Sequence, residues 1–173
     1  MKKQILVATF SFFFACVAFA QEGFHQIGVG ADIGLPIGDF GEAYNIGYGV
    51  TGKIYYGLNE DANITGTLGY LRFGIDGDSN ISGHMGMIPI MFGYNHDFDG
   101  FYVEPQVGLV ALNSKIDMSG SGFESFGGNY SSTEVSLSLG GGYNTGDWDF
   151  GLRYQIVNNA NFLGARVAYN FSI

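Results

Sequence analysis

The chain has 173 residues, with 29 glycines, 16% aromatic residues and 13% charged residues. This length allows one domain, and the low charge is unusual for a soluble enzyme, because soluble domains contain about a quarter charged residues. The excess of acidic over basic residues, 16 against 7, argues against nucleic-acid binding, which needs a basic surface. No apolar run of about 18 residues follows residue 20, so no transmembrane helix is expected there.

Residues 1–20 have the pattern of a secretory signal peptide. Lys2 and Lys3 are followed by an apolar run, and Ala18-Phe19-Ala20 fits the small-x-small cleavage rule. We therefore predict cleavage after residue 20 and a single domain over residues 21–173. Cys16, the only cysteine, would be removed, so neither a disulfide nor a cysteine metal site is expected. The alternatives are an uncleaved membrane anchor and a lipoprotein signal at Cys16.

From residue 24 onward, apolar residues recur at every second position in segments separated by turn-forming residues. A period of two over such lengths predicts strands whose faces meet different surroundings. In the last segment, for example, Leu163, Ala165 and Val167 alternate with Gly164 and Arg166. In chain order, the predicted strands cover about residues 24–35, 45–58, 62–73, 84–96, 101–111, 134–143, 148–156 and 162–173.

Two prolines interrupt this pattern. Pro89 and Pro105 fall in the fourth and fifth predicted strands. Proline removes a ladder donor, and a closed barrel has no edge strand at which that loss is harmless. We therefore expect a local bulge or kink at each of them.

The connections between the predicted strands alternate in length. Tight turns are expected at 59–61, 97–100 and 145–147, and longer loops at 36–44, 74–83, 113–132 and, shorter, 158–161. Short turns on one side and longer loops on the other are typical of outer-membrane barrels. We predict an all-β, eight-stranded, antiparallel up-and-down transmembrane β-barrel in the bacterial outer membrane. An even strand number would place both termini on the periplasmic side.

The direction in which each face points does not follow from alternation alone. The polar set is rich in glycine and poor in long charged side chains, which suits the lining of a narrow barrel better than a solvated surface. Aromatic residues also gather near strand ends, as in the two girdles of a membrane barrel. The loop-side girdle is expected from Tyr44, Tyr70, Phe73, Tyr154 and Phe162. The inverse arrangement would be a soluble, lipocalin-like barrel with an apolar cavity.

Three segments carry a resemblance to a known family: Leu35–Phe40 (LPIGDF), Tyr44–Val50 (YNIGYGV), and IPI, GY and FYVEPQVGL between Ile88 and Leu109. They resemble the eight-stranded outer-membrane β-barrel family of the OmpA and OmpX kind. The resemblance covers the whole chain after the signal, and it implies a fold rather than an activity. It also implies assembly by the barrel assembly machinery, which recognises a final Phe in this family. Here the final residue is Ile173.

The residues predicted to face the lumen include charged side chains of both signs. Asp32 and Asp149 are among them. The resemblance implies that such charges form a hydrogen-bonded network in the lumen, and eight strands enclose only enough space for side chains. Buried charges must be paired, so we expect Glu104 within reach of Lys53, Arg153 or Arg166. The alternative is a narrow channel for ions or small solutes. The predicted network consists of Lys53, Glu104, Glu134, Arg153 and Arg166.

Other candidate sites are weaker. His84 follows Asp76, Asp78 and Ser82, which would suit a lipid A-modifying enzyme, but the spacing matches no catalytic motif. The acidic loop at residues 76–80 could bind Ca²⁺, but it lacks the distal Glu of an EF-hand calcium loop. Arg72 falls on the apolar face near the outer end, where it could extend to a lipopolysaccharide phosphate.

The resulting prediction is a filled barrel with a structural or surface-interaction role. We predict no catalytic residues, no cofactor and no metal. The expected partners are the lipid bilayer, lipopolysaccharide and the assembly machinery, with no nucleic acid. The sequence names no ligand for the external loops.

Overall fold

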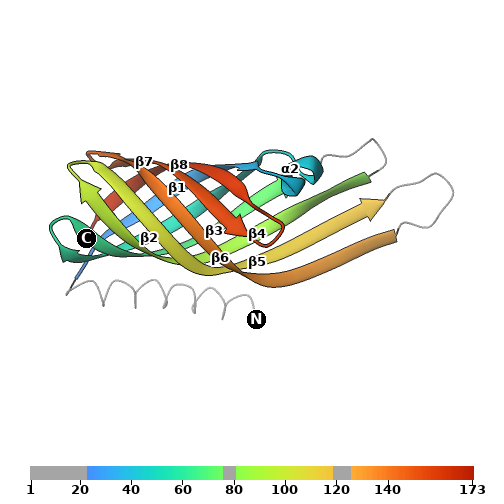
Figure 1. Cartoon of the computed structure of the whole chain (residues 1–173), viewed down its shortest axis with the longest axis horizontal. Coiled ribbons are helices and arrows are strands. Elements are labelled where there is room, and N and C mark those ends of the chain that lie inside the picture. The colour runs from blue at the N-terminus through green and yellow to red at the C-terminus, as the bar shows by residue number, and fades with distance from the viewer. Residues whose placement is uncertain (1–22, 76–80, 119–125) are drawn as a thin grey trace, which may run out of the picture.

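A computed structural model describes residues 23–75, 81–118 and 126–173 as one closed sheet of eight antiparallel strands (Figure 1). The predicted up-and-down barrel is confirmed. The strands follow one another around the barrel in chain order, and β1 pairs with β8 from Gln26–Ser172 to Pro36–Phe162. Their bounds are β1 Phe24–Pro36, β2 Gly47–Asn59, β3 Ala62–Gly74, β4 Ile81–Phe98, β5 Phe101–Met118, β6 Phe126–Thr145, β7 Trp148–Val157 and β8 Phe162–Ser172.

The tight turns all lie at one end of the barrel, here called the turn end. Asp99 and Gly100 have φ of 64° and 97°, which is the backbone of a two-residue hairpin turn that favours Asp-Gly. At the β6–β7 turn, Gly146 has a φ of 59°, which favours glycine, whereas Asp147 has no positive φ. The amide of Ile173 donates to the carbonyl of His25 over 3.0 Å, so the first and last described strands also meet at this end.

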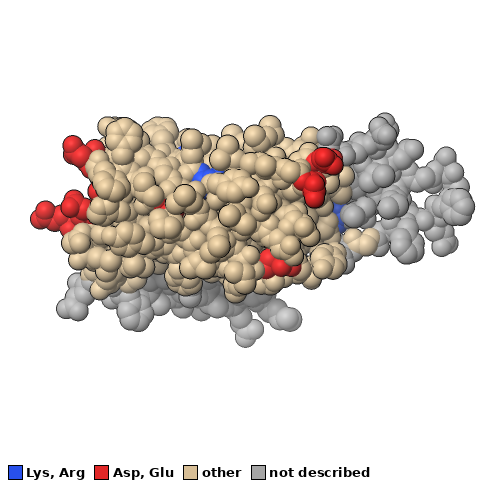
Figure 2. Space-filling view, viewed as in Figure 1, with Lys and Arg blue, Asp and Glu red and all other residues tan. Residues whose placement is uncertain are grey.

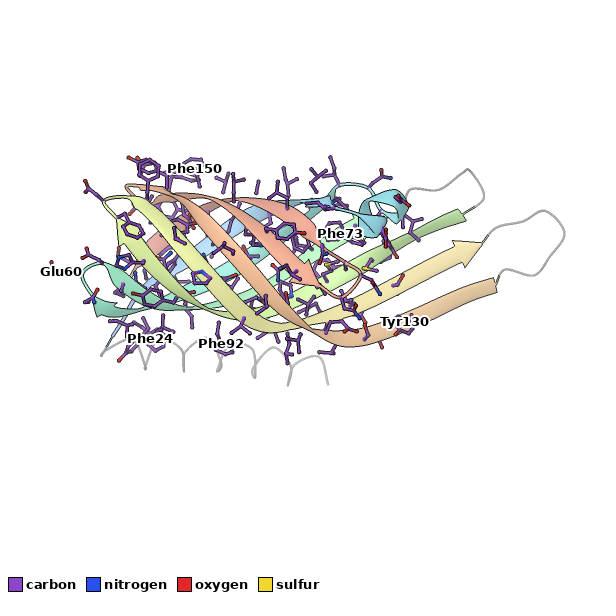
Figure 3. The ribbon with its side chains drawn as sticks, viewed as in Figure 1. Phe24, Glu60, Phe73, Phe92, Tyr130 and Phe150 are labelled. Atoms are coloured by element: carbon purple, nitrogen blue, oxygen red, sulfur yellow. The ribbon has the colours of Figure 1, made fainter. Side chains whose placement is uncertain are left out.

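The apolar face of every strand points outward, away from the lumen. Phe92 and Phe150 are 64% and 46% exposed, whereas Phe73 is fully buried inside the barrel (Figure 3). The wall on the side shown in Figure 2 is made mostly of uncharged residues, and acidic side chains lie toward both of its ends. Only a lipid environment makes an apolar outer surface of this extent favourable.

Neither proline shifts the register, so the expected bulges are absent. The β3–β4 pairing skips from Leu68–Ile90 to Leu71–Met87 beside Pro89, and both pairs keep the same register. The β4–β5 pairing skips from Gly93–Gln106 to His96–Val103 beside Pro105. Each proline interrupts the ladder on one side and stays paired with its neighbour on the other, which is enough to accommodate the missing donor.

The opposite end, here called the loop end, is more structured than predicted. Residues 36–44 contain a short helix, α2 Asp39–Ala43, where a loop was expected. Most of the expected loop 113–132 is strand, because β5 continues to Met118 and β6 begins at Phe126. We call residues 113–118 and 126–131 the sheet extension; they pair from Asn113–Ser131 to Met118–Phe126. With residues 81–86 of β4 paired beside them, they project beyond the rest of the barrel (Figure 1).

Among the described residues, no helix has the length and apolar character needed to cross a membrane.

Candidate functional site: the lumen and the loop-end rim

Three ion pairs lie inside the barrel. Two of them join strands that are not neighbours in the sheet, and the third joins the neighbouring β7 and β8. Lys53 Nζ of β2 lies 2.5 Å from Glu104 Oε2 of β5. Arg153 Nη1 of β7 lies 2.7 Å from Asp32 Oδ1 of β1, and Arg166 of β8 pairs with Asp149 of β7. Three cations thus face three anions, and five of the six side chains are almost fully buried.

Neutral side chains donate hydrogen bonds to these ion pairs, and Thr51 links two of them. The hydroxyl of Thr65 donates to Glu104 over 2.6 Å, and the hydroxyl of Thr51 donates to Asp32 over 2.6 Å. Arg166 Nε donates to the same Thr51 hydroxyl over 3.0 Å. A carboxylate with several donors keeps its charge in a low-dielectric interior. The network therefore provides the pairing that buried charges require.

Tyr102 and Tyr55 complete the network at the turn end. The hydroxyl of Tyr102 donates to Asp149 Oδ1 over 2.7 Å, and Tyr55 donates to Asp149 Oδ2 over 3.5 Å. Lys53 Nζ lies 5.6 Å and 5.7 Å from the two ring centroids, within the range of cation–π attraction. These tyrosines were not among the predicted network residues, although their positions in the polar set of each strand placed them inward.

Of the five residues predicted to form the network, the structure brings four into ion pairs. Lys53 and Glu104 pair with each other, whereas Arg153 and Arg166 pair with Asp32 and Asp149. Glu134 lies on β6, nearer to the loop end than Glu104, and is half-buried. Within the described part of the chain it forms no ion pair, so its place in the network stays a prediction.

The half of the lumen nearer the loop end is apolar, which was not predicted. Phe73 and Phe162 were expected in the outer girdle, but they are 0% and 2% exposed and their ring centroids lie 5.5 Å apart inside the barrel. Phe40 of α2 covers them, with its centroid 5.1 Å from that of Phe73. We call this cluster the apolar plug; its buried members are Phe40, Leu71, Phe73, Met87, Met91, Val110, Leu112, Val157, Ala160 and Phe162.

Little free space is left among the ion pairs of the lumen. The cavity bordered by Lys53, Tyr102, Gln106 and Arg153 has a volume of about 20 Å³, about enough for a single water molecule. Glycines make room for the larger side chains. A Cβ on Gly47 would lie 2.5 Å from the Phe73 ring, and one on Gly151 would lie 2.6 Å from the Tyr102 hydroxyl. The abundance of glycine on the inward faces therefore reflects crowding.

The rim of the loop end carries the remaining candidates. His84 lies within β4, as the predicted strand 84–96 placed it. Its Nδ1 is 3.3 Å from Nη2 of Arg72, which is exposed on the outer wall. Asp76 and Asp78 lie outside the described residues, as does the side chain of Ser82, so the proposed catalytic set and the calcium loop cannot be placed. In the described ranges, no group of three or more His, Cys, Asp or Glu could hold a metal ion.

A closed eight-stranded barrel with an apolar outer wall and a charged, filled lumen is a transmembrane β-barrel. The chain belongs to the family described as "Outer membrane protein beta-barrel domain", whose profile matches residues 5–171. No curated protein matches the sequence significantly.

Several solved structures share the fold. Ail, the attachment invasion locus protein of Yersinia pestis, is 18% identical with a TM-score of 0.65, over 87% of this chain and 100% of Ail. The N-terminal β-barrel domain of Pseudomonas aeruginosa OprF is 19% identical with a TM-score of 0.52, over 87% and 100%. Neisserial surface protein A is 16% identical with a TM-score of 0.51, over 86% and 97%. Identity at this level shows a common fold.

Proposed function

We propose that this protein is a non-enzymatic barrel of the bacterial outer membrane. The side chains that fill its lumen have a structural role, and its loop end makes contacts at the cell surface. The observation that carries this proposal is the contrast between the two parts. Among the ion pairs of the lumen, the cavity beside Lys53 and Arg153 has room for about one water molecule. The sheet extension, by contrast, projects past the barrel (Figure 1).

The sheet extension has the properties of an interaction surface. In the described part of β6, pairing with β7 begins only at Ser136–Val157, so residues 126–135 pair with β5 alone. Their other backbone edge is free to pair with an extended segment of another molecule. In this segment Tyr130 is 70% exposed (Figure 3), and Val135 is 69% exposed.

Orientation belongs to the same proposal. Secretion through the predicted signal peptide and insertion by the assembly machinery would leave the turn end, with both chain ends, in the periplasm. The acidic turns, which include Glu60 and Asp61, would then face the periplasm, and α2 and the sheet extension would face outward. This is the usual arrangement of short turns and longer loops in such barrels.

The decisive experiment compares whole cells that express the full chain with cells that express a shortened one. In the variant, residues 114–130 are replaced by Asn-Gly, a favoured hairpin turn between the paired Asn113 and Ser131. We expect proteinase K to cleave the full chain in the extension on intact cells and to spare the variant. Cleavage only after the outer membrane is permeabilised would reverse the orientation and contradict a surface role.

Planar-bilayer recording tests the alternative of a narrow channel. A filled lumen predicts no steady single-channel conductance from the purified protein. A steady current that changes when Glu104 is replaced by Gln would make the channel the better description. The lipid A-modifying enzyme would require altered lipid A in expressing cells, measured by mass spectrometry, and we expect none.

A further inference from the structure

The basic residues after residue 20 divide into two groups. Lys53, Arg153 and Arg166 lie in the lumen and are each paired with a carboxylate. The other two, Arg72 and Lys115, are exposed on the outer wall at the loop end, and neither forms an ion pair with any described residue. The outer wall is mostly apolar, and its two basic side chains, Arg72 and Lys115, lie in one region of it.

Strand register places these two residues beside His84. His84 of β4 is directly opposite Lys115 of β5, and it is opposite Gly74 of β3, two residues beyond Arg72. Directly opposed residues of an antiparallel pair share a face, with Cβ atoms about 5 Å apart. Arg72 Nη2 lies 3.3 Å from His84 Nδ1. Arg72, His84 and Lys115 therefore form one row across three strands, here called the rim triad.

Tyr70 adds a hydroxyl to this row. It precedes Arg72 on the outward face of β3, and a Cβ on Gly86 would lie 3.1 Å from its hydroxyl oxygen. Gly86 is opposite Arg72 in the register. The Tyr70 ring therefore lies across Gly86 toward the loop end, and its hydroxyl is brought to the level of Arg72.

The rim triad lies at the edge of the apolar wall. On β3 the outward residues change from Tyr70 to Arg72, and on β5 Asn113 separates the last apolar outward residue, Ala111, from Lys115. Strands rise about 3.3 Å per residue, so the Cα atom of Arg72 lies about 7 Å beyond that of Tyr70, and the Cα atom of Lys115 lies about 13 Å beyond that of Ala111. Phosphate groups of membrane lipids lie just beyond the acyl chains, so Arg72 stands near their level and the long Lys115 side chain can extend back toward it.

We propose that Arg72, His84 and Lys115, with the Tyr70 hydroxyl, bind a phosphate group of a lipid in the leaflet around the loop end. A guanidinium binds phosphate through two parallel hydrogen bonds, and an ammonium contributes a compact charge beside it. Arg72 keeps its donors available for this purpose because its only described polar contact is His84. The proposal rests on the proposed membrane orientation and extends the expected role of Arg72 to a four-residue site.

The test uses the full-length protein, folded in detergent, and native mass spectrometry of bound lipid. The probe is bis-phosphorylated lipid A, with fully dephosphorylated lipid A as its partner. Arg72→Gln combined with Lys115→Gln should weaken binding of the phosphorylated lipid about tenfold or more, since hydrogen bonds to charged groups are the strong ones. Binding of the dephosphorylated lipid should be weak and unaffected by these substitutions.

A matched control separates a site from general charge repulsion. Asn158→Asp combined with Asn159→Asp changes the net charge by the same amount, at exposed loop-end positions between β7 and β8. This control should bind phosphorylated lipid as the unmodified protein does. An equal loss in both double variants, or no loss in the Arg72 and Lys115 variant, would overturn the proposal.

Two further arms identify the source of the phosphate. Inorganic phosphate should not displace the lipid if acyl chains on the apolar wall contribute to binding. Displacement at low millimolar phosphate would instead indicate a site for a soluble anion and would refute the lipid assignment. Protease protection on whole cells reports orientation separately, so failure of the proposed function and failure of the rim triad give different results.

Discussion

Glu104, like Asp149, has three side-chain partners in the lumen. It pairs with Lys53 over 2.5 Å and accepts hydrogen bonds from Thr65 and Gln106 over 2.6 Å and 3.2 Å. Glu104→Gln keeps the shape but leaves the buried Lys53 ammonium without a counter-ion. Breaking a buried pair from one side costs about 3–5 kcal/mol. We expect a loss of this size in the free energy of unfolding, measured by urea titration of the protein in lipid, with Trp148 fluorescence as the signal.

Glu134→Gln is the control for this prediction. Glu134 is half-buried and forms no ion pair with the described residues, so the same chemical change should alter stability by less than about 1 kcal/mol. Replacing Lys53 and Glu104 together by Met should recover much of the loss, because removing both charges also removes the cost of burying them. Equal stability of the Glu104 and Glu134 variants would contradict a buried network.

Gly151 tests whether lumen glycines exist to relieve crowding. A Cβ at this position would lie 2.6 Å from the Tyr102 hydroxyl, which donates to Asp149. Gly151→Ala should therefore displace Tyr102 and cost about 1–3 kcal/mol, the usual range for overpacking. In a Tyr102→Phe background the same substitution should cost less, because the hydroxyl that it would strike is gone. Thermal unfolding of the four proteins measures the coupling.

Gly52→Ala provides the comparison for Gly151. Gly52 faces outward, and its added Cβ would meet only the Leu68 carbonyl oxygen, at 3.9 Å. The substitution should be neutral or slightly stabilising, because alanine has less freedom to lose on folding. A cost at Gly52 as large as that at Gly151 would mean that backbone conformation, not crowding by Tyr102, explains the glycines.

Sequence periodicity predicted which residues face the lumen but not which of them meet. Lys53 and Glu104 are on β2 and β5, and the side-chain period of each strand places both inward. Which cation faces which carboxylate depends on the stagger and diameter of the closed barrel, and no local pattern carries that information. The same limit applies to Asp149, which gathers Arg166, Tyr55 and Tyr102 from three other strands.

At the scale of elements, α2 is the cover of the apolar plug. Phe40 is 3% exposed, and its ring centroid lies 4.8 Å from that of Tyr44 and 5.1 Å from that of Phe73. Phe40→Ala should release α2 while the strands stay paired, because the helix is short and contacts the barrel mainly through this ring. Hydrogen exchange should become faster for the amides of α2 and remain slow in β1 and β2.

Ile37→Ala is the matched control for the cover. Ile37 is 38% exposed beside the same helix and is not part of the apolar plug. It should leave exchange in α2 nearly unchanged. If Phe40→Ala instead accelerates exchange throughout the barrel, the apolar plug is part of the global fold and α2 is not a separable cover.

The sheet extension shows where element prediction from sequence failed. Residues 113–132 are rich in Ser and Gly, which disfavour strands when considered locally. The strand is formed because β5 and β6 remain in register from Phe101–Tyr143 to Met118–Phe126, so each added pair extends an existing ladder. Phe73 and Phe162 were misplaced for a related reason, since proximity to a strand end does not reveal which face an aromatic residue occupies.

For the whole molecule, eight regular strands with an apolar exterior predict resistance to SDS at room temperature. Closure leaves no edge in the barrel itself, because β1 pairs with β8 over eleven residue pairs from Gln26–Ser172 to Pro36–Phe162. The unheated protein from the outer-membrane fraction should migrate at a different apparent mass from the boiled protein. Identical migration, with the protein found in the soluble periplasmic fraction, would contradict an inserted barrel.

The whole fold was predictable where a single physical rule acts along the entire chain. Alternation of period two, turns such as Asp99-Gly100, and alternating connection lengths together predicted the number, order and facing of the strands. What could not be predicted depends on contacts across the lumen. The division into a charged half and an apolar half, and the cover that Phe40 provides, arise only when distant strands are brought together.

The meeting of the two ends at β1 and β8 makes the barrel a ring without a unique starting point. The amide of Ile173 already donates to the carbonyl of His25, so a short peptide could join these ends without moving either strand. A chain rearranged in this way and opened at the exposed Glu60–Asp61 turn would contain the same ladders, ion pairs and apolar plug in a new order. Such a circular permutant, exported with its own leader, should fold to the same barrel, because strand adjacency and not strand sequence order holds the ring together.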